Sequence, residues 1–166
     1  MATEINVLDG EKVAYEGIFD LGEFYSHLHD WFEARKFIVS EKEYKEKIKG
    51  DTKDINIEWS AAKDVDEYSE YKIYTIFELS RITDVEVEVD GEKKTMQKGK
   101  LKIEVTATIK LDKEDKWEVT PVLKFLKAFY EKYLYNQVLD KTKADAWKYG
   151  WAYLNETKAY LNLYRF

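Results

Sequence analysis

The chain has 166 residues, of which 45% are hydrophobic and 16% aromatic, with a single proline and no cysteine. This composition indicates a folded domain with a substantial core, and it excludes a disulfide scaffold, a thiolate metal site and a cysteine nucleophile. The net charge of −6 arises from acidic residues interleaved with lysines, which excludes the basic footprint of a nucleic-acid-binding protein. No apolar run approaches the roughly 20 residues of a membrane span, and the N-terminus lacks a signal-peptide pattern, so we expect a cytoplasmic protein.

The N-terminal part is predicted to form a strand followed by a helix. Asp9-Gly10 is a turn signal, and residues 12–19 then alternate between apolar and polar side chains as a strand does. Asp20 has the character of a helix N-cap, and Glu23 three residues later completes a capping box. The helix is expected to end near Arg35. One of its faces gathers the apolar residues Leu21, Phe24, Tyr25, Leu28, Trp31 and Phe32.

The middle of the chain alternates with period two, which is typical of an antiparallel sheet with one face in water. Its first segment is charged and is predicted to lie at the sheet edge. Asp90-Gly91 is the strongest hairpin signal in the chain, and Gly99 marks a further turn. With the strand before the helix, the pattern predicts six to seven strands. Those after the helix are expected at 37–48, 55–61, 71–79, 85–89, a short strand to Met96, and 101–111.

A long C-terminal helix is predicted to begin at Thr120-Pro121, an N-cap followed by proline at the first helical position. We expect a kink or break between Asp140 and Thr142, and a further helical segment to about Tyr164. The chain therefore divides into an α+β domain at 1–139 and an aromatic-rich helical extension at 140–166, packed on that domain or on a partner. The stripe behind Pro121 contains Val122, Phe125, Leu126, Phe129 and Tyr133.

This order of elements resembles the helix-grip fold of the START and Bet v 1-like (SRPBCC) superfamily over residues 12–139. The resemblance implies a curved sheet wrapped around a C-terminal helix, with a space between them that often holds a hydrophobic ligand. Two features depart from that fold: one helix follows the first strand where two are usual, and the chain runs past the expected C-terminal end. Residues 54–105 and 116–126 also resemble a group of uncharacterised archaeal proteins, which implies no activity.

Few residues point to catalysis or metal binding. His27 and His29 are two residues apart on a helix and point about 200° apart, so they do not chelate one metal ion together. Their expected partners are Asp30 or Glu23 for His27, and Glu33 for His29. No serine lies in a nucleophile elbow and no glycine-rich phosphate loop is present. We expect no metal, no cofactor and a non-enzymatic protein, although a carboxylate pair assembled by the fold stays open.

The closing aromatic segment favours one class of function, association with a partner protein or with the chain's own copy. On a helical projection, Trp147, Trp151, Leu154 and Leu161 share a face that is expected to dock on the domain. Tyrosine suits interfaces because its ring is apolar and its tip is polar. A wide stripe that only covers a thin domain is the competing interpretation. The second face, predicted as the association surface, consists of Tyr149, Tyr153, Tyr160 and Tyr164.

The alternative function is that of a carrier for a small hydrophobic ligand, held in a cavity between the sheet and the C-terminal helix. The competing interpretation is that the same large rings fill the core, because protein interiors pack densely. The candidate lining residues are Tyr15, Trp59, Tyr71, Ile73, Phe77, Val105, Ile109, Phe125, Phe129 and Tyr133.

Overall fold

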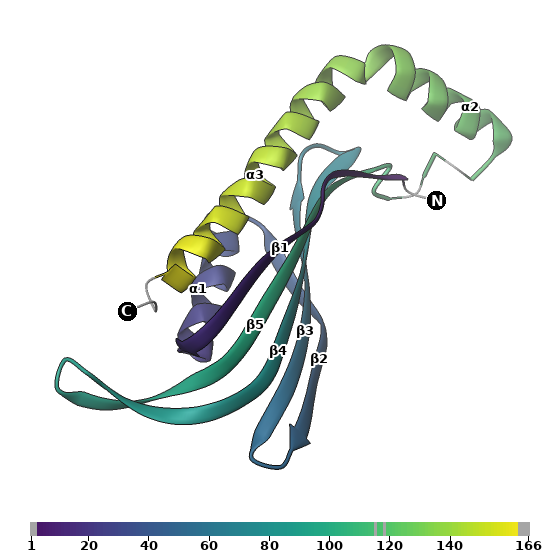
Figure 1. Ribbon diagram of the computed structural model, residues 1–166. Helices are drawn as coiled ribbons and strands as arrows, with labels where there is room; N and C mark the ends of the chain where they lie inside the picture. The colour runs from purple at the N-terminus through teal and green to yellow at the C-terminus, as the bar shows by residue number, and fades with distance from the viewer. Residues whose placement is uncertain (1–2, 115, 118, 163–166) are drawn as a thin grey trace.

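The computed structural model describes residues 3–114, 116–117 and 119–162, and it shows an α+β fold with an open five-stranded antiparallel sheet (Figure 1). The strand order is β1-β5-β4-β3-β2, so the first strand pairs with the last and β2 lies at an edge, as predicted. The strands are β1 (Thr3–Phe19), β2 (Ile38–Lys49), β3 (Thr52–Asp64), β4 (Ser69–Val89) and β5 (Glu92–Leu111). The helices are α1 (Leu21–Ala34), α2 (Pro121–Phe129), the π-helix η1 (Tyr130–Leu134) and α3 (Asn136–Asn162).

The sheet has five long strands where six to seven were predicted, because two pairs of predicted strands are continuous. The segments 71–79 and 85–89 both belong to β4, and Gly99 lies inside β5. Beside Gly99, β4 carries a bulge at Arg81, whose φ is 56°. A Cβ on Gly99 would lie 2.9 Å from the carbonyl oxygens of Ser80 and Arg81. This glycine therefore permits a close approach of two strands and does not form a turn.

The turn predicted at Asp9-Gly10 is also a bulge within one strand. β1 begins at Thr3, and its register with β5 shifts between Leu8 and Glu11. Gly10 adopts a φ of 60°, which glycine tolerates without steric cost. An extra residue of this kind bends and twists a strand without ending it. The N-terminal strand is therefore longer than the alternating pattern indicated.

Several local predictions are confirmed. The Asp20 Oδ1 atom accepts a hydrogen bond from the Glu23 N–H at 3.1 Å and caps α1, which ends at Ala34. Asp90-Gly91 forms the turn between β4 and β5. The inward residues of the strand at 101–111 and the central residues of the α1 stripe are buried. They are Leu101, Ile103, Val105, Ala107, Ile109 and Leu111 of β5, with Phe24, Leu28, Trp31 and Phe32 of α1.

The long helix α3 lies across β5 and β1, beside α1 (Figure 1). It approaches the sheet closely at Gly150, where an added Cβ would lie 3.0 Å from Ala107 Cβ and from Leu8 Cδ2. The helix therefore contacts the sheet through its backbone at this point. The buried residues of α3 follow helical spacing and are Leu139, Thr142, Ala146, Gly150, Tyr153, Leu154, Thr157 and Leu161.

The irregularity in the C-terminal helices lies earlier than predicted. α3 continues without a break through Asp140–Thr142 and across the predicted domain boundary after Leu139. The departure from α-helix is η1, where the Tyr135 N–H donates to the Tyr130 carbonyl at 2.8 Å, five residues back. Within the described residues, no helix has the combination of length and apolar character that crossing a bilayer requires.

We predict that Gly150→Val destabilises the protein, because its side chain would overlap with Leu8 and Ala107 and move α3 away from the sheet. Overpacking of this kind typically costs about 1–3 kcal/mol. Ala152→Val is the matched control, since Ala152 is exposed on the same helix, and it should cost about 0.5 kcal/mol through helix propensity alone. Urea unfolding followed by circular dichroism measures both changes. Equal losses for the two variants would show that α3 does not pack at Gly150.

Candidate interaction site

The tyrosine face predicted as an association surface contributes instead to the core. Tyr153 has no exposed surface, so this part of the prediction is wrong. Its ring stacks on Phe32 with centroids 4.5 Å apart, and its hydroxyl accepts a hydrogen bond from Thr75 Oγ1 at 3.2 Å. Burial raises the pKa of Tyr153 well above its ordinary value. Tyr153 therefore joins α3 to both α1 and β4.

The other tyrosines of that face, where the structure describes them, contact residues of the same chain. Tyr149 is half-buried and its hydroxyl accepts a hydrogen bond from Lys63 Nζ at 3.0 Å. Tyr160 is half-buried and stacks on His27 with ring centroids 4.2 Å apart. Tyr164 lies outside the described residues. Tyr149 and Tyr160 therefore help to pack α3 on the sheet and on α1.

Only part of the α3 face that was predicted to pack on the domain does so. Leu154 and Leu161 are buried, as expected. Trp147 is 50% exposed and Trp151 is half-buried, so the tryptophans lie at the margin of the contact. The buried stripe of α3 is therefore rotated toward the tyrosine side of the helix.

Most residues proposed to line a ligand cavity pack against other core side chains. The rings of Trp59 and Phe77 have centroids 4.9 Å apart, and Tyr25 of α1 approaches Trp59 to 4.6 Å. These contacts describe a core in which side chains of α1 and the sheet interlock. The buried members of the set are Tyr15, Trp59, Tyr71, Ile73, Phe77, Val105 and Ile109.

The remaining three candidates do not lie over the sheet, so their assignment to a cavity is wrong. Phe125 is 70% exposed, Phe129 48% and Tyr133 62%. They belong to α2 and η1, which extend beyond the end of the sheet (Figure 1). The sequence predicts this amphipathic stripe, but in the folded chain it faces solvent.

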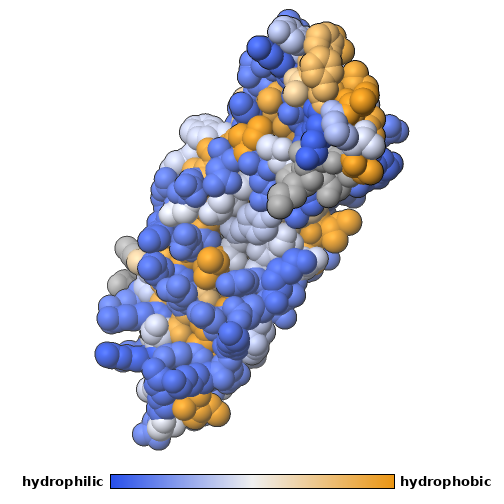
Figure 2. All heavy atoms as spheres, turned by 90° about the vertical axis from the view of Figure 1, so that its right-hand side faces the viewer, coloured by the Kyte–Doolittle hydropathy of each residue, from blue (hydrophilic) through white to orange (hydrophobic). Residues whose placement is uncertain are grey.

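These exposed side chains form what we call the outward apolar face. Each of its members is between 43% and 74% exposed. Helical spacing places Val122, Phe125, Leu126 and Phe129 along one side of α2, and the wider π turn brings Phe129 and Leu134, five residues apart, to the same side. Val119 precedes α2, and Val138 lies in the first turn of α3. Hydrophobic side chains gather over this end of the molecule in Figure 2. The outward apolar face consists of Val119, Val122, Phe125, Leu126, Phe129, Tyr133, Leu134 and Val138.

The opposite side of the same helices is attached by polar contacts to the end of the sheet and to the loops beside it. Lys127 is 5% exposed, lies 3.9 Å from the carboxylate of Asp112 and donates to Thr3 Oγ1 at 3.1 Å. Glu131 accepts a hydrogen bond from the Tyr68 hydroxyl at 2.5 Å. A buried ion pair of this kind is not strongly stabilising in itself, but leaving one partner unpaired is costly. The contacts therefore define which side of the helix faces the sheet.

A third polar contact follows four residues later at Tyr135. Its hydroxyl donates to Asp66 Oδ2 at 2.9 Å and lies 2.7 Å from Ser69 Oγ. Burial raises the pKa of Tyr135 to about 12, and the nearby Asp66 carboxylate adds to this. Partial burial opposes ionisation of Asp66, yet hydrogen bonds from Tyr135 and from the backbone N–H groups of Tyr68 and Ser69 hold the pKa of Asp66 below its ordinary value.

An open cleft of about 780 Å³ lies beside these polar contacts. Most of its charged groups already have partners: Lys116 pairs with Glu114, Lys113 pairs with Asp64, and Asp112 accepts hydrogen bonds from the backbone N–H groups of Lys116 and Trp117. It therefore presents no converging set of charges for one class of ligand. The lining residues are Asp66, Glu67, Tyr68, Asp112, Lys113, Glu114, Lys116, Trp117 and Tyr130.

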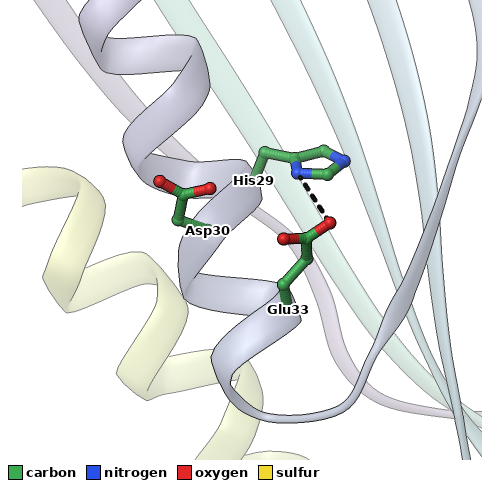
Figure 3. A group of neighbouring side chains, drawn as sticks. All are labelled: His29, Asp30 and Glu33. Atoms are coloured by element: carbon green, nitrogen blue, oxygen red, sulfur yellow. Dashed lines mark ion pairs between the residues drawn. The ribbon is translucent and has the colours of Figure 1, made fainter.

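The histidines lie on α1 and contact carboxylates. His29 Nδ1 is 3.6 Å from Glu33 Oε1, the partner expected from the sequence (Figure 3). His27 Nε2 is 2.7 Å from Glu156 of α3, not from Asp30 or Glu23. The potential ligand atoms of His29, Asp30 and Glu33 lie within 4.8 Å of one another, but both carboxylates are exposed. Such exposed groups on one helical turn are common without a metal.

Comparison with protein-family models, curated proteins and solved structures finds no match for this chain. The helix-grip and archaeal resemblances therefore stay predictions, and any function must be inferred from the geometry of the chain itself.

We predict that His29→Ala and His27→Ala leave the metal content of the purified protein unchanged, because the histidines do not converge and His29 shares its helical turn only with exposed carboxylates. Elemental analysis of the wild type and both variants measures this. Stoichiometric zinc or iron that is lost in either variant would contradict the prediction.

A second prediction concerns pH. The pKa of Asp66 is lower in the folded chain than its ordinary value of about 3.9. Its ionised form therefore stabilises the fold above that ordinary value, and this contribution is lost as the pH falls through the lower folded-state pKa. Asp66→Asn should lower the melting temperature at pH 7. The loss in free energy of unfolding should be less than about 1 kcal/mol, because the site is partly solvated. The gap between wild type and variant should narrow below about pH 4. A constant gap from pH 7 to pH 2.5 would contradict this.

Proposed function

We propose that this protein is a non-enzymatic binding protein whose contact surface is the outward apolar face of α2 and η1. One observation carries the proposal: the amphipathic helix attaches to the sheet through Lys127, Glu131 and Tyr135, and its apolar side remains in water. Soluble monomers rarely leave a contiguous apolar patch larger than a few hundred Å² exposed, and patches of that size mark interaction sites.

The shape of the surface favours a helix or a groove as the complementary partner. The face is convex because it follows one side of a helix, and its anchors are large rings and branched aliphatic side chains. Charged residues on α2 and η1 lie away from it: Lys127 and Glu131 contact the sheet side, and helical spacing places Lys124 and Lys132 on the flanks. A surface without charge at its centre is the usual composition of an interface core.

The helix-grip interpretation is part of the same proposal. A curved antiparallel sheet with the long helix α3 across it supports that resemblance (Figure 1). The carrier function is less well supported, because the rings of Phe32, Trp59 and Tyr153 occupy the space between helices and sheet. Native mass spectrometry of the purified chain tests the carrier alternative, since a co-purifying lipid or metabolite would favour it.

The proposed surface predicts a specific loss of binding in the double variant Phe125→Glu/Phe129→Glu. Removing two aromatic anchors should reduce retention of any associated polypeptide by at least tenfold, since anchors of this kind are typically worth about 2 kcal/mol or more each. The polypeptides retained by a tagged chain, its own differently tagged copy included, are quantified by mass spectrometry. The melting temperature should stay close to that of the wild type, because Phe125 is 70% exposed and about half of Phe129 (48%) is in water.

Ile48→Glu is the matched control, because Ile48 is 75% exposed but lies on the edge strand β2. It should leave retention unchanged. If the double variant retains as much as the control, the contact surface lies elsewhere. If the double variant melts far below the wild type, the two rings belong to the fold and the proposal is wrong.

A further inference from the structure

We propose that the partner of the outward apolar face is a second copy of this chain, and that two copies pair their α2–η1 segments in antiparallel orientation about a two-fold axis. This inference rests on the proposed function and names the partner. The α2–η1 segment extends beyond the end of the sheet (Figure 1), and its polar contacts lie on the side that faces the sheet. Its apolar side is therefore accessible to a second copy.

The exposed area is sufficient for a stable homodimer. The eight residues of the face are 43% to 74% exposed. Since large aromatic side chains have surfaces of about 150–250 Å² and aliphatic ones somewhat less, the face exposes on the order of 800 Å² per copy. Two copies paired along it would bury up to about 1,600 Å², the standard size of a specific protein interface. A contact with a smaller ligand would leave most of this apolar area in water.

The spacing of the anchors fits a two-fold contact. Four anchors are spaced at intervals of four, three and four residues: Val122, Leu126, Phe129 and Tyr133. This order of intervals is the same when the helix is read in either direction. An axis between positions 127 and 128 therefore places Val122 of one copy against Tyr133 of its partner, and Leu126 against Phe129. Each pair combines a smaller aliphatic side chain with a larger ring, the alternation that lets facing helices interdigitate. A self-complementary patch is what an isologous interface requires.

The charge distribution favours a second copy over a membrane surface. Helices that lie on anionic membranes carry a polar side rich in Lys and Arg. Here the polar side is engaged with the sheet through Lys127 and Glu131, which leaves only Lys124 and Lys132 as exposed cations on α2 and η1. A neutral, apolar contact is therefore the better match.

Engineered disulfides test the antiparallel arrangement, because the chain contains no cysteine of its own. Val122→Cys and Tyr133→Cys chains are prepared separately, mixed and oxidised. The mixed pair should form a heterodimer joined between the two positions, since these face each other across the axis. Two Val122→Cys chains should not crosslink, because the two positions would lie about 16 Å apart at 1.5 Å per residue, beyond the Cα separation of about 7 Å that a disulfide spans.

Sedimentation of the unmodified protein tests the association independently. Its mass should rise from 19.8 kDa toward twice that value with increasing concentration. Phe125→Glu/Phe129→Glu should remain monomeric, and Ile48→Glu should behave as the wild type. A dimer that survives the double substitution, or efficient crosslinking between two Val122→Cys chains, overturns the proposed arrangement.

If the wild type is strictly monomeric, two further results distinguish the second-copy inference from the proposed binding surface. If the tagged chain still retains another polypeptide or binds phosphatidylserine-containing vesicles in a manner lost on Phe125→Glu/Phe129→Glu, the second-copy inference is wrong and the binding surface stands. If neither occurs, both are wrong.

Discussion

The close approach of α3 to the sheet at Gly150 is the contact on which the rest of the arrangement depends. Because Gly150 has no side chain, the helix backbone lies against Leu8 and Ala107, where a Cβ would be 3.0 Å from both side chains. At this distance the ring of Tyr153 reaches Phe32 of α1 and its hydroxyl reaches Thr75 of β4, with no surface left in water. The glycine thus costs some intrinsic helix stability, which the burial of large side chains on either side of it more than offsets.

The position of α2 and η1 contrasts with that of α3. Among the described residues, α3 packs on β5 and β1, whereas α2 makes no comparable contact with the sheet, so the apolar stripe of α2 is not buried there. Its polar attachments to the body occur at intervals of four residues through Lys127, Glu131 and Tyr135, and the ring of Tyr130 adds a contact with Tyr68. The π turn keeps these three residues on the sheet side while the apolar stripe continues along the other. The aromatic side chains Phe125 and Phe129 of α2 therefore remain exposed, whereas Tyr153 of α3 is buried against the sheet and α1.

The sequence predicted the local structure well and the tertiary roles of the two C-terminal helices poorly. The cap at Asp20, the hairpin at Asp90-Gly91 and the inward face of the last strand follow from short-range chemistry, and the structure confirms them. The sequence predicts turns at Gly10 and Gly99 where the structure has bulges, because a glycine that permits a bend or a close approach has the same local signature as one that ends a strand. Only the pairing partner distinguishes the two cases.

The docking face of α3 was misplaced for a related reason. A helical projection weights large apolar side chains, so it predicts a docking face that contains Trp147 and Trp151. The buried stripe instead contains Tyr153 and the small residues Ala146, Gly150 and Thr157. Small residues bury little surface themselves but decide how near a helix can come to its support. Conversely, the apolar stripe of α2 shows only that its surface must be covered, and no local pattern says whether the cover is the chain's own sheet or another molecule.

Stability and association are therefore expected to be linked in this protein. The outward apolar face contributes little to the folded state of a single chain, since its side chains remain mostly in water there. Any partner that binds the face in the folded chain but not in the unfolded one adds stability that grows with partner concentration. If that partner is a second copy, the chain's own concentration sets the gain. The polar contacts at Asp112, Tyr68 and Asp66 have a different role, since they orient the helix before association and leave its apolar side available. Such orientation lowers the conformational entropy lost on binding, which is the physical advantage of presenting the face on a held helix.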